Sequence, residues 1–331
     1  MSEGRTLLTG STGFLGHALA RRLAGGGPLR LFLRDPARAP SPSGPDVEHA
    51  LGSLEDRDSV RRALEGCDRV VHAAALVREW DPDPDRFRRV NVDATIAIVE
   101  DAAALGVGRT LVVSSFLALG PTDGGTADER HFVAFDDHEN EYVRTKAAAA
   151  AWLRARLPAD PSLVVVYPGV IYGGGRITPG NVMVELLLDH ARGRFPGLPG
   201  RGDRVWSYVH VDDVAEGVAR ALDEPGGRQW ILGGENADQR TFWSIACRHA
   251  GLPPVRRHIP RVAARLVARL ASVRAALGDR APSLTPGALD VFDHDWALDS
   301  SRAKRELGWA PRSLDDGLRE TIAWLRAEGR L

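Results

Sequence analysis

Short aliphatic runs recur along the first half of the chain, and longer stretches with helical spacing separate them. The runs do not alternate strictly between apolar and polar positions, which is typical of strands buried on both faces of a sheet. We predict six such strands, at Arg5–Thr9, Leu29–Leu33, Val47–Leu51, Arg69–Ala73, Thr110–Ser114 and Leu163–Tyr167. Helices are predicted between most of them, at Phe14–Ala24, Arg57–Leu64, Phe87–Leu105 and Tyr142–Leu157. This alternation predicts an α/β fold with a doubly wound parallel sheet.

The pattern changes after Pro168, where two Gly/Pro-rich stretches, Tyr172–Gly180 and Phe195–Asp203, flank an apolar helix near Val182–Ala191. Three later segments are expected to return to the sheet: a strand at Val205–Val211, a helix at Asp213–Leu222 and a strand at Trp230–Leu232. We therefore expect a first domain over residues 1–168, with returns near 205–232. A smaller, discontinuous substrate domain is expected from residues 169–204 and 233–331.

Composition changes this picture little. A chain of 331 residues with 44% hydrophobic residues and a net charge of −1 is typical of a globular protein, without the basic surface of a nucleic-acid binder. No apolar run approaches the ~20 residues that span a bilayer. The first residues run directly into a strand, so no signal peptide is expected. Two cysteines, Cys67 and Cys247, make no disulfide framework, and the cytoplasm is the expected location.

A glycine-rich segment follows the first predicted strand and opens the first helix. Gly10, Gly13 and Gly16 are spaced three apart, and Thr12, Phe14 and Leu15 lie among them. Glycines here let the backbone turn tightly and approach a pyrophosphate, while the helix N-terminus offers free N–H groups to the anion. The position between strand and helix therefore predicts a dinucleotide site, although an ordinary turn with packing glycines would look similar.

Basic residues follow the second predicted strand. Arg34 comes directly after it and Arg38 lies close behind, which favours a 2′-phosphate and hence NADP as the cofactor. The alternative is NAD, with Asp35 binding the ribose hydroxyl and Arg34 solvated.

Tyr142 and Lys146 lie four residues apart, on one face of a predicted helix. A nearby cation favours the phenolate, so we expect Lys146 to lower the pKa of Tyr142. Only two of the 43 basic residues are lysines, and an ammonium is more compact than a guanidinium. Ser114 and Ser115 end the preceding strand, where a hydroxyl could bond a substrate oxygen. Turn-forming serines and an exposed Tyr–Lys pair are the structural alternatives.

Together these residues resemble the extended short-chain dehydrogenase/reductase family, which includes NAD-dependent epimerases/dehydratases. Two segments look nearer to dihydroflavonol-reductase-like and hopanoid-associated members of the family. They are Arg34-Asp35-Pro36, after the second strand, and Ser114–Gly120. Further matching segments are Val71–Ala75, Asn91–Thr95, Tyr167–Gly173, Val209–Ala215 and Leu307–Trp309. The resemblance implies that Ser115, Tyr142 and Lys146 are catalytic. It also implies cofactor contacts from Ser53, Leu54, Ala73, Ala74, Ala75, Ser114, Tyr142, Lys146, Tyr167, Pro168 and Val170.

Three positions depart from the family's pattern. Ser53 stands where an Asp usually contacts adenine, and Trp206 stands where sugar-nucleotide enzymes often carry a diphosphate-binding Arg. Phe116 and Leu117 replace the Asp-Glu pair of nucleotide-sugar dehydratases. An apolar pair cannot supply the acid and base that elimination of water from the substrate requires. Arg204 lies nearby and could still serve as a diphosphate clamp.

The expected function is therefore an NAD(P)-dependent reductase or dehydrogenase acting on a carbonyl/alcohol pair of a small organic or lipid-like substrate. Two alternatives are a nucleotide-sugar 4-epimerase with the same residues and a non-catalytic NADP-sensing regulator. We also expect a homodimer, formed through the Ala-rich helices at 87–105 and 142–157.

Two further segments have competing interpretations. The polar cluster His131, Asp136, Asp137, His138 and Glu139 could bind a metal, but we interpret it as a solvated loop at the substrate cleft. The amphipathic stretch Ile259–Leu277 could lie on a membrane surface, but we expect its apolar face to pack on the substrate domain.

Overall fold

A seven-stranded, fully parallel sheet forms the centre of the molecule. The computed structural model describes residues 4–331 apart from 41–45, 134–137, 179 and 279–284. The strands of the sheet are β1 (Thr6–Thr9), β2 (Leu29–Leu33), β3 (Val47–Leu51), β4 (Arg69–His72), β5 (Arg109–Val113), β6 (Leu163–Pro168) and β10 (Arg228–Leu232). Their order is β10-β6-β5-β4-β1-β2-β3, and every neighbouring pair is parallel. The predicted doubly wound α/β fold is confirmed.

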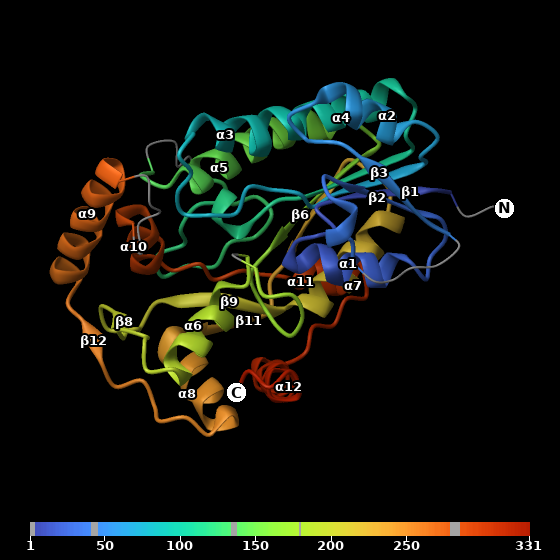
Figure 1. The fold of residues 1–331 in the computed structure, drawn as a ribbon. Helices are drawn as coiled ribbons and strands as arrows, with labels where there is room; N and C mark the ends of the chain where they lie inside the picture. The colour runs from blue at the N-terminus through green and yellow to red at the C-terminus, as the bar shows by residue number, and fades with distance from the viewer. Residues whose placement is uncertain (1–3, 41–45, 134–137, 179, 279–284) are drawn as a thin grey trace.

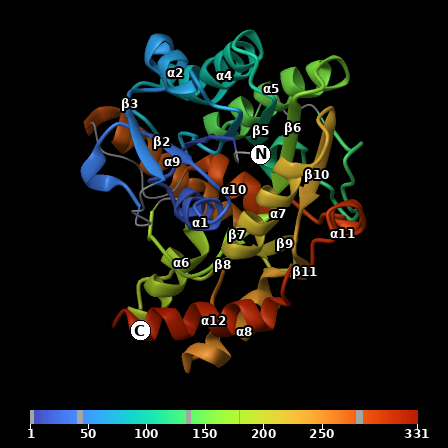
Figure 2. The ribbon, with the colours of Figure 1, turned by 90° about the vertical axis from the view of Figure 1, so that its right-hand side faces the viewer.

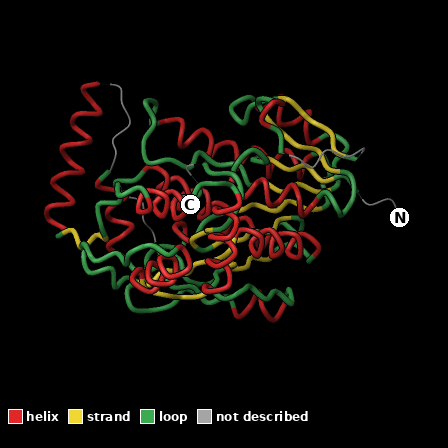
Figure 3. The backbone as a smooth tube through the Cα atoms, turned by 60° about the horizontal axis from the view of Figure 1, so that its bottom comes forward, coloured by secondary structure: helices red, strands yellow, loops and turns green. Residues whose placement is uncertain are grey.

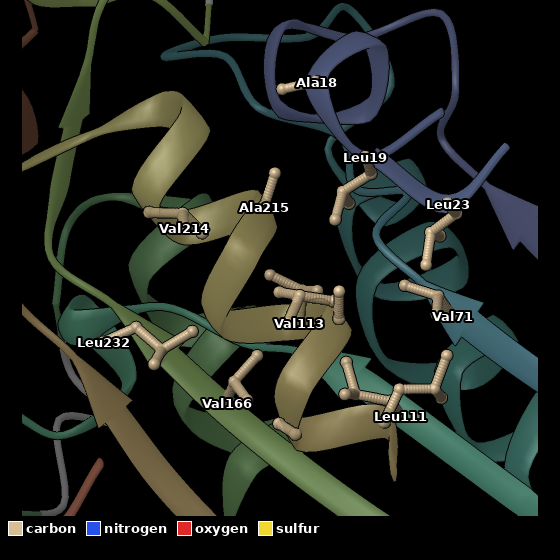
Figure 4. Close-up of a cluster of buried hydrophobic side chains, with 14 of the residues drawn as sticks. Ala18, Leu19, Leu23, Val71, Leu111, Val113, Val166, Val214, Ala215 and Leu232 are labelled. Atoms are coloured by element: carbon tan, nitrogen blue, oxygen red, sulfur yellow. The ribbon is translucent and has the colours of Figure 1, made fainter. Parts of the chain in front are cut away.

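Helices cover both faces of this sheet (Figures 1 and 2). One face carries α2 (Arg57–Leu64), α3 (Asp85–Arg88), α4 (Ala94–Ala104) and α5 (Glu141–Arg156). The other carries α1 (Phe14–Leu23) and α7 (Val211–Asp223), with α11 (Ser301–Glu306) at its side. Under α1 and α7, side chains such as Leu19, Val113 and Val166 meet in one buried cluster (Figure 4). Burial on both faces explains why the strand sequences are continuously apolar.

The helix predicted at 87–105 is interrupted by a π-helical turn. Residues Arg89–Asp93 form this turn between α3 and α4. It inserts an extra residue into the helix and changes the direction in which Asn91 points, which a period of 3.6 residues does not predict.

A second, smaller sheet lies beyond the end of β6. It contains β7 (Val170–Tyr172), β9 (Val205–His210) and β11 (Glu235–Asp238), in the order β11-β9-β7. The prediction that the strand at 205–211 returns to the main sheet is therefore wrong. Strand β10 occupies the free edge of β6, so β9 pairs with β7 instead.

The remaining elements surround the smaller sheet. They are α6 (Val182–Ala191), α8 (Gln239–Ala250), α12 (Leu314–Ala327) and the short strand pair β8 (Leu198–Pro199) and β12 (His258–Ile259). Their buried side chains form a separate core with Tyr208, Phe242 and Trp243 at its centre. The 3-10 turns are η1 (Pro36–Arg38), η3 (Phe116–Ala118) and η4 (Leu157–Ala159).

Two helices stand at the end of the molecule opposite the N-terminus (Figures 1 and 3). They are α9 (Arg261–Gly278) and α10 (Pro286–Asp293). Helix α9 packs through Ala264 and Ala268, whereas Val262 and Leu266 are exposed. The expectation that its apolar face packs on the substrate domain is wrong, because the small alanine face makes that contact. Among the described helices, none is long and apolar enough to cross a bilayer.

Candidate active site

The glycine loop between β1 and α1 leaves room only for glycine at two positions. A Cβ on Gly16 would lie 1.9 Å from the carbonyl oxygen of Gly10. Gly10 has φ +79°, and a Cβ there would lie 2.6 Å from the amide nitrogen of Ala74. The loop is thus pressed against the segment after β4, with Ser11 fully buried between them.

The N-terminus of α1 is uncapped. Gly13 is the N-cap residue and offers no side chain, and the first turn contains no acidic residue. The orphan N–H groups and the positive end of the helix dipole therefore remain available to an anion. These two features, the tight cradle and the open helix end, fit a dinucleotide pyrophosphate with Thr12, Phe14 and Leu15 beside it.

Basic groups gather beyond the end of β2. Arg34 and Arg38 are both exposed, and no described acidic side chain pairs with either. Asp35 caps a 3-10 turn, where its carboxylate accepts a hydrogen bond from the amide of Ala37 at 3.0 Å. Arg176, which the sequence did not single out, reaches the carbonyl of Arg38 at 3.1 Å. Arg176 therefore joins Arg34 and Arg38 in the region beyond the end of β2.

The segment after β3 is held by a serine rather than by a carboxylate. The amide of Ser53 donates to the hydroxyl of Ser59 at 3.1 Å, and the Ser53 hydroxyl accepts from the amide of Glu55 at 3.3 Å. Leu54 packs against two buried clusters. These contacts show how the segment is shaped without the usual Asp.

A buried chain of hydrogen bonds begins at His72, the last residue of β4. The strand thus ends one residue earlier than predicted. Burial lowers the pKa of His72 to about 3, so its ring is neutral. The ring lies 2.7 Å from the hydroxyl of Thr9 and 3.1 Å from that of Thr95. Thr9 also accepts from the amide of Ala74 at 3.3 Å, and Thr95 donates to the carbonyl of Asn91 at 2.9 Å. Each group is satisfied if Thr9 donates to Nδ1 and Nε2–H donates to Thr95.

This chain fixes the segment Ala73–Ala75, whose residues are half-buried beside the glycine loop. Asn91 extends it, because its amide accepts from the backbone of Leu76 at 2.8 Å and donates to Thr145 at 3.1 Å. Thr145 lies on α5. The π-helical turn therefore links the β4 end to the helix that carries Tyr142 and Lys146.

Three predicted catalytic side chains come together at the end of β5. Ser115 is the N-cap of η3, and its hydroxyl accepts from the amide of Leu117 at 3.3 Å. The Ser115 hydroxyl lies near the phenol of Tyr142 and favours its charged form. Lys146 Nζ lies 6.0 Å from the centroid of the Tyr142 ring and 3.4 Å from the carbonyl oxygen of Val113.

The electrostatics of this group differ from the prediction. Burial raises the pKa of Tyr142 to about 12, although Ser115 opposes the shift. Burial also lowers the pKa of Lys146 to about 8. The expected lowering of the Tyr142 pKa by Lys146 is wrong for the protein alone, because loss of water around the phenol raises the pKa more than Ser115 lowers it.

A carboxylate that the sequence gave no reason to notice joins the start of α5 to α10. Glu79 Oε2 accepts from Asn140 Nδ2 at 2.9 Å and from Thr285 Oγ1 at 3.2 Å. Asn140 is the N-cap of the helix that carries Tyr142, and Thr285 is the N-cap of α10. Only tertiary structure brings these three residues together, since they come from distant parts of the chain.

The remaining predicted cofactor residues differ in what they can offer. Ser114 is buried, and its backbone amide extends the sheet by donating to the carbonyl of Val166 at 2.8 Å. Pro168 ends β6 and Val170 begins β7, at the bend between the two sheets. The Tyr167 side chain is fully buried and its hydroxyl donates to Gln229 at 3.2 Å, so this side chain is already engaged in the core.

An aromatic group lies next to Ser115. Phe116 meets Trp296 edge to face at 5.4 Å between ring centroids. Trp206 is 4% exposed, packs against Phe292 at 4.8 Å and donates to the carbonyl of His294. Trp206, which stands at the position of the usual diphosphate-binding Arg, is thus a core residue, and the sequence did not indicate Phe292 or Trp296.

Arg204, the residue that could have served as a diphosphate clamp, is already engaged. Arg204 Nη1 lies 3.6 Å from Asp295, whose other carboxylate oxygen accepts from the backbone of Val205 at 2.8 Å.

Part of the polar cluster before Tyr142 is buried rather than solvated. His138 Nε2 lies 2.9 Å from Asp290 of α10, and His138 Nδ1 accepts from the amide of Asn140 at 3.0 Å. Asp136 and Asp137 lie outside the described residues. Among the described residues, no group of three or more potential ligands could hold a metal ion.

The sequence profile of the NAD dependent epimerase/dehydratase family matches residues 6–233, from β1 through β10. The chain belongs to this family. The family is one of NAD-dependent epimerases and dehydratases, and the curated relatives of the chain include reductases, so the chain is an enzyme that uses NAD(P).

Two similar curated proteins match along almost the whole chain. Sterol demethylase protein B of Methylococcus capsulatus is 32% identical, over 98% of this chain and 99% of its own length. The ketoreductase of Stigmatella aurantiaca that acts on 4-hydroxy-2-methyl-3-oxo-4-farnesyl-3,4-dihydroquinoline-1-oxide is 30% identical, over 93% and 92%.

Solved structures show the same architecture. The crystal structure of gox2253 is 33% identical and aligns with a TM-score of 0.81 over 99% of both chains. The dTDP-glucose 4,6-dehydratase DesIV of Streptomyces venezuelae, solved with NAD bound, aligns with a TM-score of 0.77 over 98% of this chain and 97% of its own. At 24% identity, this second likeness shows the fold alone.

Proposed function

We propose that the chain is an NADP-dependent reductase that converts a ketone or aldehyde of an apolar, lipid-like substrate to the alcohol. The observation that carries the proposal is the meeting of Ser115, Tyr142 and the buried Lys146 at the end of β5. The two relatives support it, since one is a ketoreductase of a farnesylated molecule and the other is a protein of sterol demethylation.

The protonation state of Tyr142 suits reduction. With a pKa of about 12, the phenol keeps its proton at neutral pH and can donate it to a carbonyl oxygen. Ser115 binds the same oxygen. Lys146, whose pKa of about 8 keeps it charged at neutral pH, stabilises the phenolate left behind. When bound, NADPH supplies the hydride.

The preference for NADP rests on Arg34, Arg38 and Arg176. A 2′-phosphate removed from water needs positive partners, and Arg34 and Arg38 are unpaired among the described side chains. Asp35, the residue that would favour NAD, already accepts a hydrogen bond from Ala37.

A nucleotide-sugar 4-epimerase is the second candidate, because the same three residues serve that reaction. It is less well supported. Its diphosphate carries two charges, and an unpaired buried charge costs several kcal/mol. Trp206 replaces the usual arginine, and Arg204 is paired with Asp295.

Assays on a panel of long-chain and alicyclic ketones test the proposal. We expect net oxidation of NADPH, reduced ~10²–10⁴-fold in Tyr142→Phe and strongly reduced in Ser115→Ala, with cofactor binding retained. Cofactor titration of both variants is the control for folding. Interconversion of UDP-glucose and UDP-galactose without net NADPH oxidation on any carbonyl would establish the epimerase instead.

We also propose a homodimer in which α4 and α5 of two copies form a four-helix bundle. Exposed alanines on both helices, Ala103, Ala104, Ala148 and Ala151, support this proposal because small side chains let helices approach closely.

A further inference from the structure

Helix α9 directs large apolar side chains away from the protein. Val262, Leu266, Val267 and Leu270 are 82%, 60%, 57% and 54% exposed. Three of them recur every four residues, so they share one helix face. Exposed leucines are common singly, but a contiguous set on one helix face marks an interaction surface.

The orientation of this face is fixed by contacts on the other side of the helix. Ala264 and Ala268 pack against Leu289 of α10, and both alanines are almost completely buried. Arg261 and Arg265 pair with Asp293 of α10 at 2.8 and 2.9 Å. The ion pairs and the alanine contact hold the apolar face outward.

Positive charge borders the apolar face. Arg269 lies on the same helix, and Arg256 and Arg257 lie just before it; all three are exposed. In the part of the chain that the structure describes, no acidic side chain pairs with them. The whole chain carries a net charge of only −1, so this is a local excess of positive charge.

We propose that α9 docks on the surface of an anionic phospholipid bilayer, lying in the interface with Val262, Leu266, Val267 and Leu270 inserted. An amphipathic helix with apolar residues on one face and arginines at its border is the form that binds lipid headgroups and acyl chains together. A second copy of the chain fits less well. A two-fold contact would bring like-charged arginines together, and one exposed helix face is small against the ~800 Å² per partner of a stable interface.

Helix α9 is connected through α10 to the start of the helix that carries Tyr142. Its neighbour α10 is joined to the start of the catalytic helix through Glu79, and Gly287 of α10 lies so close to Asn140 that a Cβ would be 2.8 Å from its amide nitrogen. The proposed membrane face is therefore next to the element that carries Tyr142. This step rests on the proposed function, whereas the docking itself does not.

Vesicle sedimentation with the full chain tests the docking without any substrate. We expect binding to phosphatidylcholine vesicles that contain phosphatidylglycerol, weakened by salt, and much less binding to phosphatidylcholine alone. The double variant Leu266→Gln/Leu270→Gln should bind more than ~10-fold less tightly. Arg269→Gln should bind about fivefold less tightly, as expected for one basic residue near an anionic surface.

Matched variants give the controls. Leu51 is 59% exposed on β3, and Leu51→Gln should bind vesicles as the native protein does. Arg62, an exposed residue of α2, serves in the same way for charge. Equal binding by the α9 variants and the controls would overturn the proposal, as would no binding to anionic vesicles. Loss of a dimer in Leu266→Gln/Leu270→Gln, seen by light scattering with no vesicle binding, would assign the face to self-association instead.

Discussion

Lys146 is a buried lysine, and burial disfavours its charged form. Its ammonium lies 3.4 Å from one carbonyl oxygen, and burial lowers its pKa from 10.5 to about 8. A lowering of this size corresponds to about 3 kcal/mol of unfavourable free energy for the charged form. The residue is thus placed for chemistry at a cost in stability, a common feature of functional sites.

The variant Lys146→Met should therefore stabilise the cofactor-free protein. The folded-state pKa is below that of the unfolded chain, so the destabilisation is fully present below about pH 8 and declines as pH rises toward 10.5. Urea unfolding at neutral pH should give a free energy of unfolding ~1–3 kcal/mol higher than native, with the gap closing at alkaline pH. A less stable variant at neutral pH would contradict the assignment.

Arg34→Ala tests cofactor choice. Loss of a charge-assisted hydrogen bond of ~1.5–3 kcal/mol should weaken NADPH binding by roughly 10- to 100-fold and leave NADH binding nearly unchanged. Fluorescence titration with both cofactors measures this, and Arg62→Ala is the matched surface control. Tighter NADH binding by the native protein, or an unaltered preference in Arg34→Ala, would favour the NAD alternative.

At the scale of elements, the sequence predicts best where local pattern and packing agree. The six predicted strands of the main sheet form within one residue of their expected ends, because strands buried on both faces need continuous apolar runs. The assignment of β9 failed because pairing partners depend on which sheet edge is free. The π-helical turn and the outward face of α9 also depend on neighbours that no periodicity reveals.

The candidate site shows the same division. Gly10, Gly16 and Ser115 could be singled out because they follow predicted strands, and Tyr142 and Lys146 because of their spacing on one helix face. Glu79, Asn140, Thr285 and Arg176 were missed, since their contacts are made across distant segments. The direction of the Tyr142 pKa was also missed, because burial is a property of the folded protein.

Gly16→Ala tests the glycine loop as a structural unit. The added Cβ would lie 1.9 Å from the Gly10 carbonyl oxygen, so the loop must move. We expect a loss of ~1–3 kcal/mol in stability and much weaker binding of either cofactor. Gly25→Ala at the other end of α1 is the control, because its Cβ would meet nothing within 4 Å. Unchanged thermal unfolding and cofactor affinity in Gly16→Ala would refute this description of the loop.

At the scale of the whole molecule, the proposed homodimer gives a test of assembly. Ala148 and Ala151 are exposed on α5, whereas Ala147, Ala149 and Ala150 pack inside the chain. Ala148→Glu/Ala151→Glu should separate the dimer into folded monomers, because unpaired carboxylates cannot be buried between helices. Light scattering at micromolar concentration measures the mass, and Ala323→Glu on α12 is the control. A native mass equal to one chain would refute the dimer.

The order of strands in the main sheet also has a consequence during synthesis. Strand β6 leaves the ribosome well before β10, its permanent neighbour, because all of α6, β9 and α7 lies between them in the sequence. Until β10 arrives, the run Leu163-Val164-Val165-Val166-Tyr167 is an open sheet edge, uncharged and rich in β-branched residues. Such edges recruit strands from other chains. A nascent or truncated chain that ends between residues 168 and 228 is therefore expected to aggregate, and chaperones that cover exposed strands should matter most while that stretch is being translated.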